Sequence, residues 1–74
     1  MTNSIILEKT IYTVQKCYSD CSFVNSVSSW KTFMSQAFGA IRLATVLVSD
    51  EEYPELEILW EEYKPKFEAL IYGE

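Results

Sequence analysis

Residues 29–48 read SWKTFMSQAFGAIRLATVLV, and their apolar positions recur with the period of an α-helix. One seam is formed by apolar residues at alternating steps of four and three: Trp30, Met34, Ala37, Ile41, Ala44 and Val48. A second seam lies beside it: Phe33, Ala40, Leu43 and Leu47. Together the seams cover about half of the helix circumference, more than a surface helix buries. The pattern therefore predicts a central helix that contacts two neighbours, with Ser28 or Ser29 as its N-cap.

Small residues recur along this predicted central helix. Ala37, Ala40 and Ala44 would let a neighbouring backbone come close. Gly39 costs about 1 kcal/mol relative to Ala in a helix interior. We expect close packing, rather than a deliberate bend, to account for this glycine.

A first helix is predicted over residues 4–21. Its apolar residues fall on one narrow stripe: Leu7, Ile11, Val14, Tyr18 and Cys21. Asn3 or Ser4 can cap its start, because either side chain can accept a hydrogen bond from a free backbone N–H.

Residues 22–28 are predicted to connect the first two helices as a loop, since Ser and Asn side chains bond their own backbone and resist helix formation. Phe23, Val24 and Val27 are too apolar for a free loop, so we expect the connection to lie against the core.

A third helix is predicted over residues 54–72, after a short turn at residues 49–52. Its apolar stripe keeps the same rhythm: Leu56, Trp60, Tyr63, Phe67 and Leu70. Pro54 suits the first position of a helix and Gly73 suits its end. Trp30 and Trp60 are interpreted as core anchors, and Trp60→Ala is expected to unfold the domain.

Pro65 lies inside this third segment, where its ring removes one backbone hydrogen bond and forces a kink or a break. By helical angle it sits opposite the apolar stripe, on the solvent side. We therefore predict one kinked helix rather than two helices. The fold class that follows is all-α, a compact three-helix bundle in a single domain over residues 1–74, with an open helical hairpin plus one helix as the alternative.

Charge is distributed unevenly along the chain, whose net charge is −5. Residues 25–48 carry Lys31 and Arg42 and no acid, whereas nine of the eleven acids lie in residues 49–74. Such a chain would repel phosphate, so direct nucleic-acid binding is not expected. No apolar run is long enough to span a membrane, and no secretory signal is visible, so we expect a cytoplasmic protein without membrane contact.

The sequence offers little for catalysis. It contains no His, which removes the commonest general base and metal ligand. Cys17 and Cys21 lie four residues apart; a redox or metal pair is one interpretation, and two reduced core thiols is the favoured one. No serine elbow and no glycine-rich phosphate loop occurs, so no catalytic, cofactor or metal site is expected.

The acids of the third segment form a predicted acidic face, made up of Asp50, Glu51, Glu52, Glu55, Glu57, Glu61 and Glu62. A divalent-metal site and mimicry of phosphate charge are the functional interpretations. The favoured interpretation is electrostatic, because acids near the first turn stabilise a helix and solvate its outer face.

Five large apolar residues fall on the wrong side of their predicted helices: Ile5, Tyr12, Phe38, Ile58 and Tyr72. They suggest a second buried surface, because a domain of this size seldom gains enough stability from one core. A two-fold homodimer is the expected form, and another protein partner is possible on the same grounds. Phe38 is expected to contact the second chain, since folding alone would leave it in the polar stripe around Ser35 and Arg42.

Two stretches carry a resemblance: SQAFGA, residues 35–40, and LWEEYKPKFEALIYG, residues 59–73. They resemble short uncharacterised helical proteins of Gram-positive bacteria and their mobile elements, over the last two helices only. The resemblance implies a bacterial or phage cytosolic setting. We expect a non-enzymatic interaction module, with an accessory regulator on a mobile element as its suggested role. The alternative is an acidic inhibitor that mimics nucleic acid and occupies the nucleic-acid site of a host defence or DNA-binding protein.

Overall fold

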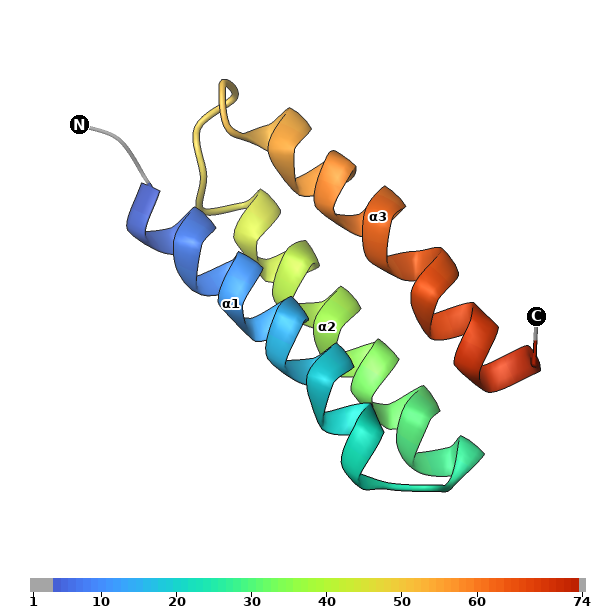
Figure 1. The fold of residues 1–74 in the computed structure, drawn as a ribbon. Coiled ribbons are helices and arrows are strands. Elements are labelled where there is room, and N and C mark those ends of the chain that lie inside the picture. Colours follow the sequence, from blue (N-terminus) through green and yellow to red (C-terminus); the bar gives the residue numbers. More distant parts are fainter. Residues whose placement is uncertain (1–3, 74) are drawn as a thin grey trace.

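The computed structural model describes residues 4–73, which form three packed helices and, within that range, no strand. Helix α1 spans Ser4–Asp20, the short 3₁₀-helix η1 spans Cys21–Phe23, α2 spans Val27–Thr45 and α3 spans Tyr53–Tyr72. Successive helices run antiparallel, and α2 lies between α1 and α3 (Figure 1). The predicted all-α three-helix bundle and its central helix are confirmed.

The core receives side chains from all three helices. Its buried apolar members are Leu7, Val14, Cys17, Cys21, Ala37, Ile41, Ala44, Leu56, Leu59, Tyr63 and Phe67. Val14, Leu56 and Phe67 are fully buried. The ring of Tyr18 meets Tyr63 and Phe67 edge-on, with centroids 5.8 and 5.4 Å apart. These contacts join α1 to α3, so the molecule is a closed bundle and not an open hairpin with one helix added.

The connection between α1 and α2 differs from the prediction. Helix α2 begins at Val27, and its cap is Ser26, whose Oγ accepts a hydrogen bond from Ser29 N at 3.4 Å. Ser28 and Ser29 are therefore not the cap. The other predicted caps, Asn3 and Ser4, fall outside the residues whose side chains the structure describes.

Two hydrogen bonds from Trp30 join this connection to the start of α2. The indole Nε1–H of Trp30 donates to the carbonyl oxygens of Cys21 at 3.1 Å and of Val24 at 3.3 Å. Phe23 is 81% exposed and Val27 is also exposed, which corrects the expectation that both lie against the core; Val24 is half-buried. The indole satisfies two carbonyls of the link, so the link does not need Phe23 as an anchor.

Helix α2 ends at Thr45, three residues before the predicted end. The backbone N–H of Val46 donates to Leu43 O at 3.2 Å and that of Leu47 to Ala44 O at 2.9 Å, so the last turn tightens to 3₁₀-type bonding. The chain then turns as predicted at residues 49–52, where the N–H of Glu52 donates to Ser49 O at 3.0 Å.

Helix α3 is one continuous helix, as predicted. Pro54 is its second residue, and Gly73 closes it with a φ of 74° while its N–H donates to Ala69 O at 3.0 Å. Pro65 lies inside the helix and is exposed, which confirms its predicted place on the solvent side. The kink at Pro65 stays a prediction.

The expectation for Gly39 is wrong. A Cβ added to this residue would meet nothing within 4 Å, and the residue is exposed. No neighbouring helix within the described chain therefore requires a glycine here. Its backbone is ordinary helix, because Gly73 is the only described residue with a positive φ.

Gly39→Ala is accordingly expected to stabilise the chain by about 1 kcal/mol, since Ala loses less backbone entropy in a helix and has room for its methyl group. Thermal unfolding followed by circular dichroism measures the gain. Gly73→Ala is the matched control and should destabilise, because its left-handed φ of 74° suits glycine. A Gly39→Ala variant that melts below the parent would show that the methyl group has no room.

Candidate interaction surfaces

A pair of aromatic rings joins α2 to α3 on one side of the bundle. The centroids of Phe38 and Trp60 lie 5.1 Å apart at an interplanar angle of 41°. The guanidinium carbon of Arg42 lies 5.8 Å from the centroid of the Phe38 ring. Phe38 remains 40% exposed. Folding alone therefore leaves Phe38 exposed, as predicted, although Trp60 covers part of its ring. Its contact with a second chain stays a prediction.

An open groove of about 380 Å³ follows this aromatic pair along the boundary between α2 and α3. Its lining comes from both helices: Phe38, Ile41, Arg42, Thr45, Tyr53, Leu56, Glu57, Trp60 and Glu61. A second, smaller groove continues past the aromatic pair and is lined by Met34, Ser35, Phe38, Trp60 and Lys64. We call this whole surface, from Tyr53 to Lys64 on α3, the seam surface.

Trp60 belongs to this seam surface more than to the core. It is half-buried and packs against the core, with its ring 6.5 Å from that of Phe67. The fully buried aromatic of α3 is Phe67, which therefore takes the anchoring position predicted for Trp60. The Trp60 ring also contacts the ring of Phe38.

The other four candidate interface residues are exposed on the outer helices. Ile5 and Tyr12 are exposed on α1, and Ile58 and Tyr72 are exposed on α3. Ile58 lines a shallow groove between α1 and α3, away from the groove that contains Phe38. Phe38 and Ile58 therefore line different grooves, and contact of these five residues with a second chain stays a prediction.

One apolar surface was missed because its residues were assigned to a buried seam. Leu43 is 64% exposed and Leu47 is exposed, although both belong to the second predicted seam of the central helix. With α1 they line an open apolar groove, the leucine groove: Ile6, Lys9, Thr10, Thr13, Ala40, Leu43, Ala44 and Leu47. The helical angle correctly placed them beside the core, but neither α1 nor α3 covers them.

The predicted acidic face is divided between several directions. Glu57 and Glu61 line the seam surface, whereas Glu55 and Glu62 line the groove on the α1 side. Asp50, Glu51 and Glu52 lie in the turn before α3, and of all seven only Glu52 is half-buried, whereas the others are exposed. Glu62 pairs with Lys66 at 3.6 Å. This distribution supports a solvated helix surface more than one contiguous acidic face. Among residues 4–73, no group of Cys, Asp or Glu is placed to hold a metal ion.

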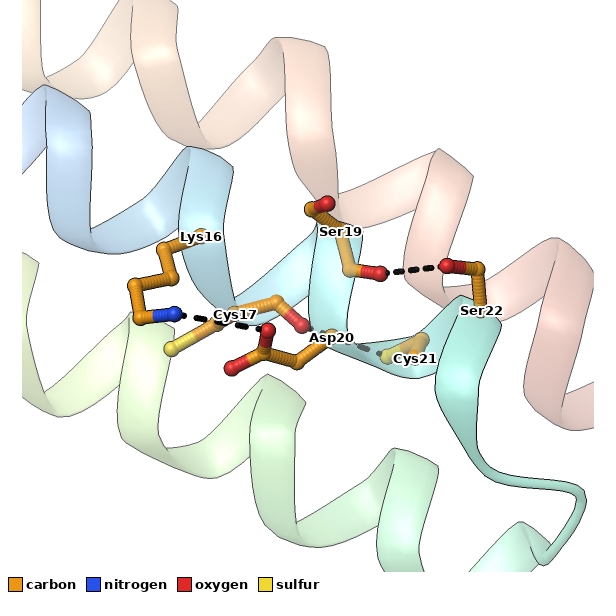
Figure 2. Close-up of polar contacts among 6 residues, drawn as sticks. All are labelled: Lys16, Cys17, Ser19, Asp20, Cys21 and Ser22. Atoms are coloured by element: carbon orange, nitrogen blue, oxygen red, sulfur yellow. Dashed lines mark hydrogen bonds and ion pairs between the residues drawn. The ribbon is translucent and has the colours of Figure 1, made fainter.

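Cys17 and Cys21 are buried free thiols, as predicted (Figure 2). The Sγ of Cys21 donates to the backbone oxygen of Cys17 at 3.4 Å, and Lys16 pairs with Asp20 at 3.6 Å beside them. Burial raises the pKa of both thiols above the ordinary value. The carboxylate of Asp20 adds to the rise for both, while Lys16 opposes it for Cys17. The thiolate forms are thus disfavoured in the folded chain.

Alkylation of these thiols by iodoacetamide at pH 7.5 is expected to be at least about tenfold slower in the folded chain than in denaturant, because the reactive thiolate is scarce and covered. The stabilising contribution of the raised pKa is complete below the ordinary thiol pKa and is lost as pH rises through the raised folded value. Denaturant melts above pH 8.5 should therefore weaken more in the parent than in Cys17→Ala/Cys21→Ala. Equal slopes would contradict the shift.

Comparison with known proteins found no matching family, no matching curated protein and no matching solved structure. Along residues 4–73, no helix has the length and apolar character needed to cross a membrane.

Proposed function

We propose that this chain is a small non-enzymatic interaction module of the bacterial cytoplasm that associates with a second copy of itself. An accessory role on a mobile element is the setting that the resemblance of residues 35–40 and 59–73 suggests. The observation that carries the proposal is the amount of apolar surface left outside the bundle.

Among residues 4–73, eleven large apolar side chains are exposed. They occur on every helix and in the α1–α2 connection, and Phe23, Val46 and Ile5 are among the most exposed. Single exposed apolar residues are ordinary, but contiguous ones mark interaction surfaces. The leucine groove and the seam surface are both contiguous and both border the central helix.

Association would also add stability that the small core does not supply. A domain below about 80 residues seldom gains more than about 3–5 kcal/mol from one core. Covering one large apolar side chain adds about 1.5–3 kcal/mol before the entropy of association is subtracted. A self-associated form therefore supplies stability that the single bundle lacks.

Mimicry of nucleic acid, the alternative function, receives less support. It requires acids on one contiguous face, whereas Glu55 and Glu57 line grooves on opposite sides of α3. The acids instead surround the helix, as expected for a solvated surface.

Sedimentation equilibrium of the purified full chain, from about 1 μM to 1 mM, tests the proposal. We expect the average mass to rise with concentration to twice the monomer mass of 8.6 kDa and to stop there. A mass that stays at one monomer over the whole range would overturn the proposal, and so would copurification of a tight hetero-complex whose partner occupies both surfaces.

A further inference from the structure

We infer that the seam surface is the two-fold interface of a homodimer, in which α2 of each copy packs on α3 of the other. This inference rests on the proposed self-association and assigns it to one surface. The two-fold axis would run parallel to the helices and pass between the two Phe38–Trp60 pairs. Each Phe38 would then gain the Trp60 ring of the second copy as its outer neighbour.

The charges along the seam carry this assignment. The groove linings contain one charged residue of α2, Arg42, and three of α3, Glu57, Glu61 and Lys64. By helical spacing, Lys31 lies two turns from Phe38 on the same stripe of α2, and Glu68 lies one turn past Lys64 on the same stripe of α3. Arg42 and Glu57 line the same groove, yet among residues 4–73 the only ion pairs within 4.0 Å are Lys16–Asp20 and Lys66–Glu62. The charges that flank the aromatic pair are therefore available to a second chain.

The positions of these charges match across a two-fold axis parallel to the helices. Phe38 and Trp60 mark one height, because their rings touch. At 1.5 Å per residue, Arg42 lies about 6 Å from that height toward the turn before α3, and Glu57 lies about 4.5 Å away in the same direction. Lys31 lies about 10.5 Å in the other direction, where Glu68 lies about 12 Å away.

A rotation about that axis keeps each height and exchanges α2 for α3. Arg42 would therefore face Glu57 of the second copy, and Lys31 would face Glu68 of the second copy, twice in each dimer. The alternative axis, perpendicular to the helices, would place Glu61 close to its own symmetry mate, which like charges oppose. Charge complementarity thus selects both the occupant and the direction of the axis.

Size and composition agree with the assignment. The bundle measures 42 × 19 × 15 Å, so a standard interface of about 800 Å² per partner must use almost a whole face. The seam surface runs along such a face and places Trp, Phe and Arg at its centre, residue types that are enriched in the cores of interfaces. The leucine groove is more apolar, but Lys9 is the only charged residue in its lining, so that lining offers no charge pairing to fix the position of a second copy.

The test compares dimer dissociation constants by sedimentation equilibrium, with helix content by circular dichroism as the check on folding. Arg42→Glu and Glu57→Arg should each weaken the dimer by about tenfold or more. The double variant Arg42→Glu/Glu57→Arg restores opposite charges at the same two positions and should return the constant to within about threefold of the parent. Raising NaCl from 50 to 500 mM should weaken the parent dimer.

Phe38→Glu and Leu43→Glu form the matched pair that separates the surfaces, because both residues are exposed on α2 but line different grooves. Phe38→Glu should raise the dissociation constant by at least about 100-fold, and Leu43→Glu should leave it unchanged. Dissociation by Leu43→Glu with no effect of Phe38→Glu, or single charge reversals without rescue, would overturn the seam assignment while self-association stands. A parent chain that is monomeric at 1 mM would overturn the proposed function itself.

Discussion

Phe67→Ala is expected to lower the free energy of unfolding by about 3–5 kcal/mol, which equals the whole stability of a typical domain of this size. Phe67 is fully buried, and its ring contacts Tyr18 of α1 edge-on and lies near Trp60 of α3. Removing the ring therefore leaves a cavity at the point where α1 meets α3. We expect the variant to lose most of its helical circular dichroism at 25 °C.

Phe23→Ala is the matched control, because it removes the same atoms from a side chain that is 81% exposed. Its stability should stay within about 0.5 kcal/mol of the parent. A cooperative melt of Phe67→Ala near that of Phe23→Ala would show that α3 packs through another face.

Ala37→Asp is the second change with a large expected effect. Ala37 is fully buried on the central helix, so the introduced carboxyl would lose its water without gaining an obvious partner. We expect a loss of more than about 4 kcal/mol at pH 7, seen in urea titration as an unfolded chain without denaturant.

The pH dependence of Ala37→Asp distinguishes a buried charge from a simple steric clash. Burial would raise the folded pKa of the introduced carboxyl, so the destabilisation should be smaller at pH 4 than at pH 7. Gln36→Asp, at the exposed neighbouring position, controls for the helix propensity of Asp. An equal loss of unfolding free energy at pH 4 and pH 7 would indicate overpacking instead.

The helical period carried the fold prediction because it depends only on local geometry. Spacing alone placed four residues on the apolar stripes that are buried in the structure: Leu7, Val14, Leu56 and Phe67. Turn chemistry was equally local, so the turn at residues 49–52 and the left-handed Gly73 could also be predicted.

The surfaces could not be predicted in the same way, because a helical angle says which residues share a face and not which neighbour covers it. Leu43 shares a seam with Phe33, yet Phe33 is half-buried and Leu43 is 64% exposed. Phe38 stays 40% exposed, as expected, but the path of α3 also brings Trp60 against it, which the helical angle did not predict. Both outcomes depend on how the helices pack together, which no local pattern specifies.

The connection after α1 shows a second limit. Phe23 was expected to anchor the link because it is large and apolar, but hydrogen bonds from the Trp30 indole hold the link instead. Such a bond joins residues nine positions apart, beyond the reach of a cap or turn motif. Hydropathy alone therefore chose the wrong aromatic residue.

Pro65 affects which faces of α3 can be covered in a dry contact. Because proline has no N–H, the carbonyl oxygen of Glu61, one turn earlier, lacks its usual helical donor. Pro65 and Glu61 are both exposed, so water can solvate that oxygen in the single bundle. A partner that dried the outer face of α3 would strip this solvation at a cost of about 1–3 kcal/mol. The proline thus favours contacts that leave this backbone oxygen in water, which for the seam surface places Glu61 at the wet edge of the dimer contact and not at its dry centre.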